Sequence, residues 1–337
     1  MPTLACTAAC RHCGSHSRPN RPERLDSAII MESIRQAGNL GFAGVVFTGG
    51  EATLEWDSLL RAIRFASELG LPPRLVTNAH WAVSVDIART TLDTLVERGL
   101  RDINFSTGDE HTRFVPMDYV VNAAVAAAER GIDIHIMVEY SAARQITKAR
   151  ILSHSLLDGL TSAQRESIRI TESPWMPLDP LFPGCYAPGD TINELNVTLR
   201  EGCPSVLRTY ILEADGRVAA CCGLGIGDIP ELYVATAKGK DFLRRAIESA
   251  ESDLIKLWLH CKGPERILAW AASKEPDIRW QHVYAHSCQV CQRIYKDNHV
   301  ANVIRENYTE VITDIIQSLW FDEHYYPQRL ASVARKE

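Results

Sequence analysis

Three cysteines stand close together near the start of the chain, in the segment LACTAACRHCGSHS of residues 4–17. They are Cys6, Cys10 and Cys13, with the spacing C-x3-C-x2-C. Three thiolates leave a fourth ligand position open, and such soft ligands suit both zinc and iron–sulfur clusters. His12 or His16 would complete a structural zinc site. The loop alone therefore leaves zinc and an iron–sulfur cluster as alternatives.

Composition separates metal binding from disulfide formation. Ten of the 337 residues are cysteines, and the net charge of −6 argues against nucleic acid as a partner. The chain has no apolar run of 18 residues and no secretion signal, so we expect a cytoplasmic protein without a membrane partner. Clustered cysteines in a reducing compartment indicate metal ligands rather than disulfides.

Short apolar segments alternate with helical patterns between residue 22 and about residue 172. The periodicity predicts helices over 24–41, 56–70, 85–99, 117–131 and 144–158. It predicts strands over 44–50, 74–78, 102–108, 132–140 and 167–173. This alternation is typical of an α/β fold with a parallel sheet, with about six strands when the segment before Cys6 is included. The carboxyl ends of parallel strands share one edge, so the cysteine loop should meet the TGGE segment of residues 48–51 there.

Gly49, Gly50 and Glu51 follow the second strand, when the segment before Cys6 is counted as the first. With this motif and the cysteine motif, the chain resembles the radical SAM superfamily over about residues 1–172. The resemblance implies a partial (β/α)6 barrel of the TIM type. It implies that the three cysteines hold a [4Fe–4S] cluster whose fourth iron binds S-adenosylmethionine (SAM). Reductive cleavage of SAM would yield a 5′-deoxyadenosyl radical that abstracts a substrate hydrogen, with no catalytic side chain identified.

The resemblance also implies side chains that contact SAM. Glycines let the backbone approach a ligand closely, and the Glu51 carboxylate would accept from the methionine ammonium. For the positions after Glu51, a helix cap or a surface ion pair is the alternative role. The implied contacts are His12, Gly49, Gly50, Glu51, Asn78, Ser106, Asp109, Glu139 and Arg144.

A second group of cysteines surrounds a hairpin predicted over 207–222, with its turn at Asp215–Gly216. The pattern C-x12-G-x4-C resembles SPASM and Twitch domains, and the shorter Twitch type fits better. The resemblance implies one auxiliary [4Fe–4S] cluster closed by four thiolates, and a four-thiolate zinc site is the alternative. The implied ligands are Cys203, Cys221, Cys288 and Cys291. Cys222, next to Cys221, is an alternative ligand, whereas Cys185 and Cys261 stay unassigned.

These expectations divide the chain into a radical SAM partial barrel over 1–180, an auxiliary cluster domain over 181–300 and a helical tail over 301–337. The five prolines of residues 172–190 indicate a linker or lid. Further helices are predicted near 238–259 and 299–320.

An auxiliary cluster favours oxidation or cross-linking of the substrate. The favoured substrate is a ribosomally synthesised peptide. Because the chain begins at the cluster loop, we expect this peptide to be recognised directly or through a separate leader-recognition protein. Flavodoxin or ferredoxin would be the reducing partner. Two alternatives stay open: a radical SAM dehydrogenase of a small alcohol, and a zinc-stabilised binding protein without catalysis.

Overall fold

A computed structural model describes residues 1–141, 144–174, 176, 186–187 and 189–325. The chain forms two compact units. The first unit contains Met1–Trp175 with Leu212–Arg217, and the second contains Met176–Ile211 with Val218–Glu337. Most prolines of residues 172–190 lie outside the described residues, and so does Cys185. The predicted linker or lid therefore stays a prediction.

The first unit is built on a parallel sheet of five strands in sequential order. Its strands are β1 (Val45–Phe47), β2 (Pro73–Thr77), β3 (Asp102–Gly108), β4 (Asp133–Tyr140) and β5 (Ile168–Pro174). Alternate residues of the central strands are fully buried, among them Ile103 and Phe105. In register, Thr77 pairs with Phe105 and Gly108 pairs with Glu139, so the carboxyl ends of neighbouring strands lie together. The predicted α/β fold is confirmed.

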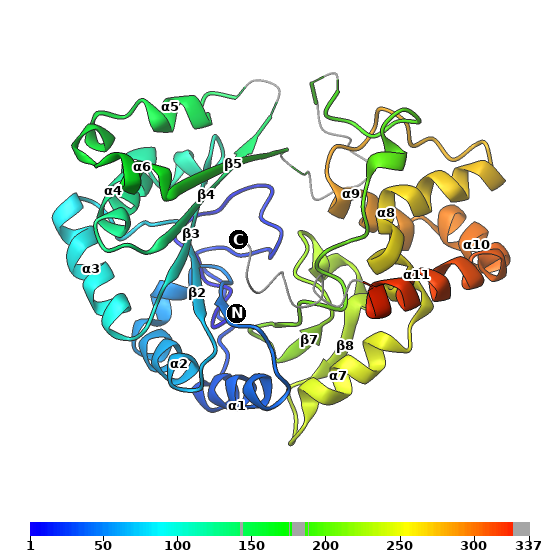
Figure 1. The fold of residues 1–337 in the computed structure, drawn as a ribbon, viewed down its shortest axis with the longest axis horizontal. Helices are drawn as coiled ribbons and strands as arrows, with labels where there is room; N and C mark the ends of the chain where they lie inside the picture. Colours follow the sequence, from blue (N-terminus) through cyan, green and yellow to red (C-terminus); the bar gives the residue numbers. More distant parts are fainter. Residues whose placement is uncertain (142–143, 175, 177–185, 188, 326–337) are drawn as a thin grey trace. The chain divides into compact units, whose positions relative to one another are not determined.

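Helices line one side of this sheet (Figure 1). They are α1 (Ser27–Asn39), α2 (Trp56–Glu68), α3 (Val85–Glu97), α4 (Met117–Ala128), α5 (Lys148–Leu152) and α6 (Ser162–Glu166), with the short 3-10 helices η1 (Ala52–Glu55), η2 (His111–Arg113) and η3 (Ser155–Gly159). Side-chain caps start several of them: Asp26 accepts a hydrogen bond from the Ala28 amide and Ser84 from the Ile87 amide. The predicted helices are confirmed except the one over 144–158. There α5 ends at Leu152, and the His154 side chain caps η3 instead.

The segment before Cys6 lies beside the turn that follows β1. The Gly50 amide donates to the Thr3 carbonyl at 2.9 Å, and the Glu51 amide donates to the Ala5 carbonyl at 2.8 Å. Thr3 and Ala5 form isolated bridges with Arg24 and Arg18, so the segment stays outside the main sheet. The expectation of about six strands thus corresponds to five sheet strands and one bridged segment.

The second unit packs helices around its own apolar core. A small sheet, most of whose residues belong to this unit, contains β6 (Ile211–Leu212), β7 (Arg217–Ala219) and β8 (Tyr233–Thr236). The 3-10 helices of the unit are η4 (Val197–Leu199), η5 (Ile226–Asp228), η6 (Pro230–Leu232) and η7 (Tyr308–Glu310). The helices are α7 (Phe242–Glu251), α8 (Leu254–Lys274), α9 (Ser287–Lys296), α10 (Asn298–Asn307) and α11 (Ile312–Tyr325). Trp258, Leu259 and Val290 belong to its core.

The hairpin predicted around Gly216 is present, with the Glu213 amide donating to the Arg217 carbonyl at 2.9 Å. The helix predicted over 238–259 is instead two helices. Asp253 separates them because its side chain accepts from the Ile255 and Lys256 amides and starts α8.

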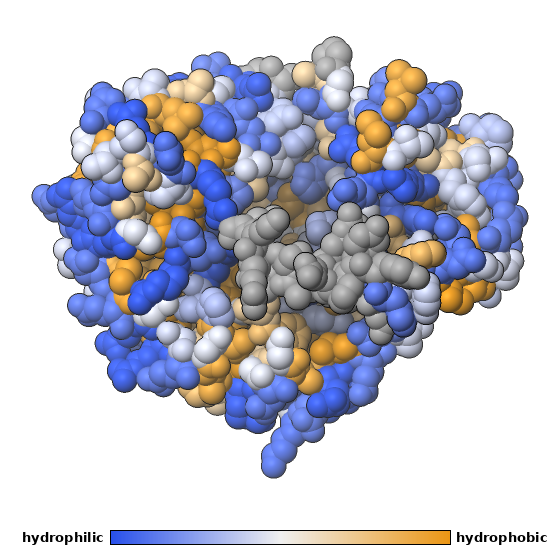
Figure 2. All heavy atoms as spheres, in the orientation of Figure 1, coloured by the Kyte–Doolittle hydropathy of each residue, from blue (hydrophilic) through white to orange (hydrophobic). Residues whose placement is uncertain are grey.

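On the face shown in Figure 2, hydrophilic side chains cover much of the surface and hydrophobic ones form scattered patches. Within the described part of the chain, no helix has both the length and the apolar character that crossing a bilayer requires.

Candidate functional site

Three cysteine side chains converge in the loop that follows the first bridged segment. Burial is the main cause that raises the pKa of the Cys6 thiol to about 11 and that of Cys10 to about 12, and the neighbouring Cys13 contributes to both increases. Such thiols lose their protons most readily when they bind a positive metal centre. The Ala8 amide donates to Cys6 Sγ at 3.4 Å, and the Ser17 amide donates to Cys13 Sγ at 3.3 Å. Three sulfurs with N–H donors fit the ligand set of an iron–sulfur cluster.

Gly49 and Gly50 make room for the protein's own backbone. A Cβ atom at Gly50 would lie 2.0 Å from the Ala5 carbonyl oxygen, and one at Gly49 would lie 2.5 Å from the Thr3 carbonyl oxygen. The glycines therefore allow the segment that leads into Cys6 to pack against the turn after β1. The prediction that they also let the backbone approach SAM stays a prediction.

Glu51 is only 1% exposed, and its carboxylate is already well supplied with donors. Oε1 accepts hydrogen bonds from the Thr53 amide, the Thr53 hydroxyl at 2.6 Å and the Thr77 hydroxyl at 2.9 Å. Oε2 accepts from the Asn78 amide at 2.9 Å. Glu51 thus ties the turn after β1 to the end of β2, and its contact with the SAM ammonium stays a prediction.

Asn78 connects the end of β2 to the cysteine loop. Its Nδ2 atom donates to Thr7 Oγ1 at 3.0 Å and lies 3.6 Å from Cys6 Sγ. Its Oδ1 atom accepts from the His80 amide at 3.0 Å. The structure therefore brings Asn78, a predicted SAM contact, against a predicted cluster ligand.

Glu110 is a buried carboxylate that sequence reasoning missed. Arg11 Nε donates to Glu110 Oε1 at 2.9 Å, and Arg113 forms a second ion pair with the same carboxylate. Burial by itself would raise the pKa of Glu110, but the two arginines hold it below its ordinary value. Because Arg11 stands between Cys10 and His12, Glu110 fastens the cysteine loop to the end of β3. Its position in the polar run STGDEH, directly after a strand, was the available signal.

His12, His111 and Glu139 meet beside this loop, with potential ligand atoms within 4.8 Å of one another. Glu139 Oε1 accepts from the Glu110 amide at 2.9 Å, and Oε2 lies 2.8 Å from His111 Nδ1. His12 Nε2 lies 3.9 Å from Glu139 Oε1, and burial lowers the pKa of His12 to about 4. His12 and Glu139, two predicted SAM contacts, are therefore adjacent. His111 lies with them, although it was not predicted from the sequence.

The remaining predicted SAM contacts have other neighbours in the structure. Asp109 accepts from the Gln145 amide at 2.9 Å and the Ile146 amide at 2.8 Å, so its carboxylate binds the loop that precedes α5. Arg144 lies over the Tyr140 ring, 4.6 Å from its centroid, and 3.7 Å from Glu172. Ser106 lies on β3 opposite Met137 of β4. Their roles toward SAM stay predictions.

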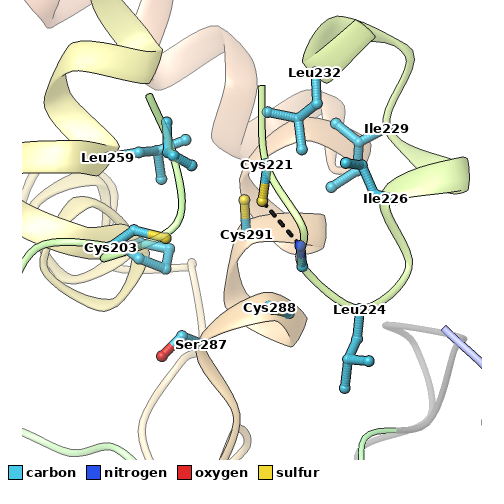
Figure 3. A pocket seen from close by; sticks show the side chains of 13 residues that line it. Cys203, Cys221, Leu224, Ile226, Ile229, Leu232, Leu259, Ser287, Cys288 and Cys291 are labelled. Atoms are coloured by element: carbon cyan, nitrogen blue, oxygen red, sulfur yellow. Dashed lines mark hydrogen bonds between the residues drawn. The ribbon is translucent and has the colours of Figure 1, made fainter. Parts of the chain in front are cut away.

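The second group of cysteines lines one apolar pocket of the second unit. Figure 3 shows Cys221 and Cys291 pointing toward one another, with Cys203 and Cys288 at the same pocket. The Gly223 amide donates to Cys221 Sγ at 3.1 Å. Backbone N–H groups of residues 205 and 206 face Cys203, and that of residue 224 faces Cys288. Thiol ligands surrounded by N–H donors fit a cluster here as well.

Local structure explains why these cysteines converge. Cys288 and Cys291 stand three residues apart on α9, whose first turn is capped by the His286 side chain. A Cβ atom at Gly223 would lie 3.0 Å from Cys288 Sγ and 3.2 Å from Cys221 Sγ, so a glycine fits between the two thiols. Cys222 is exposed, with its sulfur 3.4 Å from Ser205 Oγ, and it does not line the pocket.

Burial dominates the acid–base behaviour of the second thiol group. It raises the pKa of Cys288 to about 12 and the pKa values of Cys221 and Cys291 well above the ordinary range. Neighbouring thiols of the same group raise them further. As in the first loop, these sulfurs need a cationic centre to become thiolates at neutral pH.

The chain is similar to one curated protein and to solved structures. A putative peptide biosynthesis protein, YydG of Bacillus subtilis (strain 168), is 23% identical over 152 residues, which cover 45% of this chain and 46% of that protein. The chain thus spans about half the length of this curated relative. Two crystal structures of Streptococcus suis SuiB are also similar. One covers 66% of this chain and 59% of SuiB with a TM-score of 0.41, and the other, bound to S-adenosylmethionine, covers 77% and 64% with a TM-score of 0.44, each at 15% identity.

The family match falls on the unit that holds the three-cysteine loop. Residues 1–138 match the family described as the radical SAM superfamily. The matched region contains Cys6, Cys10 and Cys13, the turn with Glu51, and strands β1 to β3 with most of β4. The first unit of this chain therefore carries a radical SAM domain.

Proposed function

We propose that this enzyme carries out SAM-dependent radical chemistry on a peptide, which it oxidises or cross-links. The observation that carries the proposal is the presence of two separate thiol groups. One group has three cysteines in a loop of the matched family region, and the other has four cysteines around an apolar pocket. Three ligands suit a cluster with an open iron, whereas four ligands suit a cluster closed to substrate.

The radical SAM match over residues 1–138 implies a [4Fe–4S] cluster and SAM as cofactors. When bound, they supply a 5′-deoxyadenosyl radical that abstracts a hydrogen atom from the substrate. Cys6, Cys10 and Cys13 would hold the cluster. Amide groups of Ala8 and Ser17 donate to two of these sulfurs. Hydrogen bonds to thiolates and the fixed loop geometry would tune and orient the centre.

His12 and Glu139 would form the polar wall of the SAM site. Because burial holds the pKa of His12 down to about 4, the imidazole stays neutral at physiological pH. A neutral ring can lie against an adenine without introducing a charge. Glu139 is held by the Glu110 and His111 amides, so its carboxylate has one fixed orientation.

An auxiliary [4Fe–4S] cluster would occupy the pocket of Cys203, Cys221, Cys288 and Cys291. The exposed position of Cys222 supports Cys221 as the ligand. A fully ligated cluster in an apolar pocket suits electron transfer rather than substrate binding. An overall two-electron oxidation or a coupling reaction therefore fits this chain better than an isomerisation. Flavodoxin or ferredoxin is the proposed reductant for the first cluster.

A peptide is the proposed substrate because the curated relative is described as a peptide biosynthesis protein. Leader recognition would fall to a separate protein or to direct docking. A small alcohol is the alternative substrate class, and the same cluster arrangement would serve its dehydrogenation.

Deuterium transfer separates the two substrate classes. The reduced enzyme is incubated with SAM and either perdeuterated synthetic peptides, encoded by short reading frames beside the gene, or deuterated cyclic polyols. The proposal expects deuterium in 5′-deoxyadenosine from a peptide and none from the polyols. A C6A/C10A/C13A variant is the control and should give no label from either. Label from the polyols alone would overturn the peptide assignment.

A further inference from the structure

Helix α8 is interrupted beside the four-cysteine pocket. Gly263 has φ of 77° and ψ of 158°, which no helical residue adopts, and Pro264 follows it. A Cβ atom at Gly263 would lie 2.3 Å from the Glu201 carbonyl oxygen. The interruption therefore lets the chain before Cys203 pass close to α8. Helical structure resumes at Pro264, which places Glu265 in the first turn of the second helical segment.

Glu265 is a carboxylate buried in this first turn, with 3% of its surface exposed. Its Oε1 atom accepts a hydrogen bond from Ser287 Oγ at 2.6 Å. Ser287 begins α9 and lines the pocket together with Cys288 and Cys291, and Pro264 lines it as well. Glu265 thus follows the pocket residue Pro264 in sequence and accepts a hydrogen bond from the pocket residue Ser287. Buried carboxylates are rare because desolvation of the charge is costly, so its place beside the thiols calls for a function.

The contacts of Glu265 place its carboxylate beside the thiols. Pro264, Ser287 and Cys288 line the pocket, and Glu265 directly follows the first of them. Its carboxylate is one hydrogen bond from Ser287, the residue next to the proposed ligand Cys288. In a low-dielectric pocket such a charge acts strongly over short distances.

We propose that Glu265 sets the reduction potential of the auxiliary cluster and keeps it low. The inference rests on the proposed function, because it requires a cluster on the four cysteines. Adding an electron beside a fixed negative charge is unfavourable, and net charge is one of the factors that set cluster potentials. Glu265 acts through the cluster and is therefore a positioning residue rather than a catalytic one. A low potential would make the reduced cluster a strong donor to the next electron acceptor.

Two variants separate the charge of Glu265 from its hydrogen bond. Glu265→Gln keeps an oxygen that can accept from Ser287 but removes the charge. Ser287→Ala removes the hydrogen bond but keeps the charge. Glu201→Gln is the matched control, because it removes one negative charge from an exposed side chain in the same region.

The midpoint potential of the auxiliary cluster is measured by redox titration followed by electron paramagnetic resonance. The full chain is used in a C6A/C10A/C13A background, so that the auxiliary cluster alone gives the signal. We expect Glu265→Gln to move the midpoint to more positive potential, with Ser287→Ala and Glu201→Gln close to the parent and iron content equal in all. A midpoint that does not move in Glu265→Gln, or that moves as far in Ser287→Ala, would overturn the inference.

Iron content separates the remaining outcomes. If Glu265→Gln loses the auxiliary iron, the carboxylate serves cluster assembly and the tuning role is wrong. If the parent background itself binds no iron, the proposed function fails first, and the role of Glu265 fails with it.

Discussion

Arg11 and Glu110 join the cysteine loop to the sheet: Arg11 Nε donates to Glu110 Oε1 at 2.9 Å, although 99 residues separate them in sequence. Arg11 lies directly between Cys10 and His12, so a shift of this contact would move a cluster ligand and a predicted SAM contact together. The carboxylate also pairs with Arg113 of η2. A buried carboxylate between two guanidinium groups is a strong anchor because the hydrogen bonds are charge-assisted.

Glu110→Ala should therefore loosen the loop and reduce iron at the first site by about half, because Arg11, next to the predicted ligand Cys10, loses its contact with the end of β3. Iron per chain after anaerobic desalting measures the effect. Glu129→Ala is the control, since Glu129 pairs with Arg89 on the surface of the same unit. Equal iron retention in the two variants would show that Glu110 is not an anchor of the loop.

Asn78→Ala should shift the potential of the first cluster to more negative values. The variant keeps the backbone amide that binds Glu51 but removes the Nδ2 group near Cys6 Sγ. Loss of an N–H donor leaves more negative charge on the sulfur and disfavours reduction. Redox titration of the wild type, Asn78→Ala and the exposed-site control Asn39→Ala tests this. A midpoint that matches the control would mean that the Asn78 amide does not reach the ligand.

Gly50→Ala should lower the free energy of unfolding by about 3 kcal/mol or more, because backbone cannot yield easily to the new methyl group. The added carbon would lie 2.0 Å from the Ala5 carbonyl oxygen. Gly159→Ala is the matched control, since a methyl group added there would have no atom within 4 Å. Urea denaturation of both variants makes the comparison, and equal midpoints would contradict the packing described for the first segment.

Cys221→Ala should remove the auxiliary iron, whereas Cys222→Ala should retain it. Only the first of these adjacent sulfurs lines the four-cysteine pocket. Iron and acid-labile sulfide are measured in each variant after anaerobic reconstitution. The reverse pattern would assign the ligand to Cys222 and require the hairpin to turn its other face to the pocket.

We expect the folded protein to become less stable in mild acid because of the partly buried side chain of His80. Burial lowers the pKa of His80 below its ordinary value, although the nearby charge of Glu51 opposes this. As pH falls below about 6.5, the unfolded chain binds a proton that the folded chain resists, so stability decreases. Denaturation midpoints between pH 7.5 and pH 5 should decline less steeply in His80→Gln than in the wild type. Parallel declines would show that His80 makes no contribution.

Much of this architecture could be predicted from local pattern. Alternating strand and helix periods predicted the parallel sheet. The resemblance to SPASM and Twitch domains implied the four later cysteines as one group, and these cysteines line one pocket. The role of Gly50 could not be predicted, since the collision that it avoids involves a carbonyl 45 residues away in sequence. The break in α8 had a local signal, Gly263–Pro264, but it lies beyond the helix predicted near 238–259.

Long-range ion pairs were the main feature not predicted from the sequence. Glu110 and His111 follow a strand as ordinary loop residues would, and only the fold brings Arg11 and Glu139 to them. Burial of Glu265 likewise depends on the kink and on Ser287, 22 residues later. Sequence spacing cannot reveal such partners, because neither residue belongs to a periodic pattern.

Cleavage of SAM tests the central claim most directly. The wild type and the C6A/C10A/C13A variant are purified anaerobically, reduced with dithionite and assayed for iron and for 5′-deoxyadenosine. Two [4Fe–4S] sites predict about eight irons per wild-type chain, about four in the variant, and 5′-deoxyadenosine from the wild type alone. Undiminished 5′-deoxyadenosine from the variant would contradict the assignment of these three cysteines.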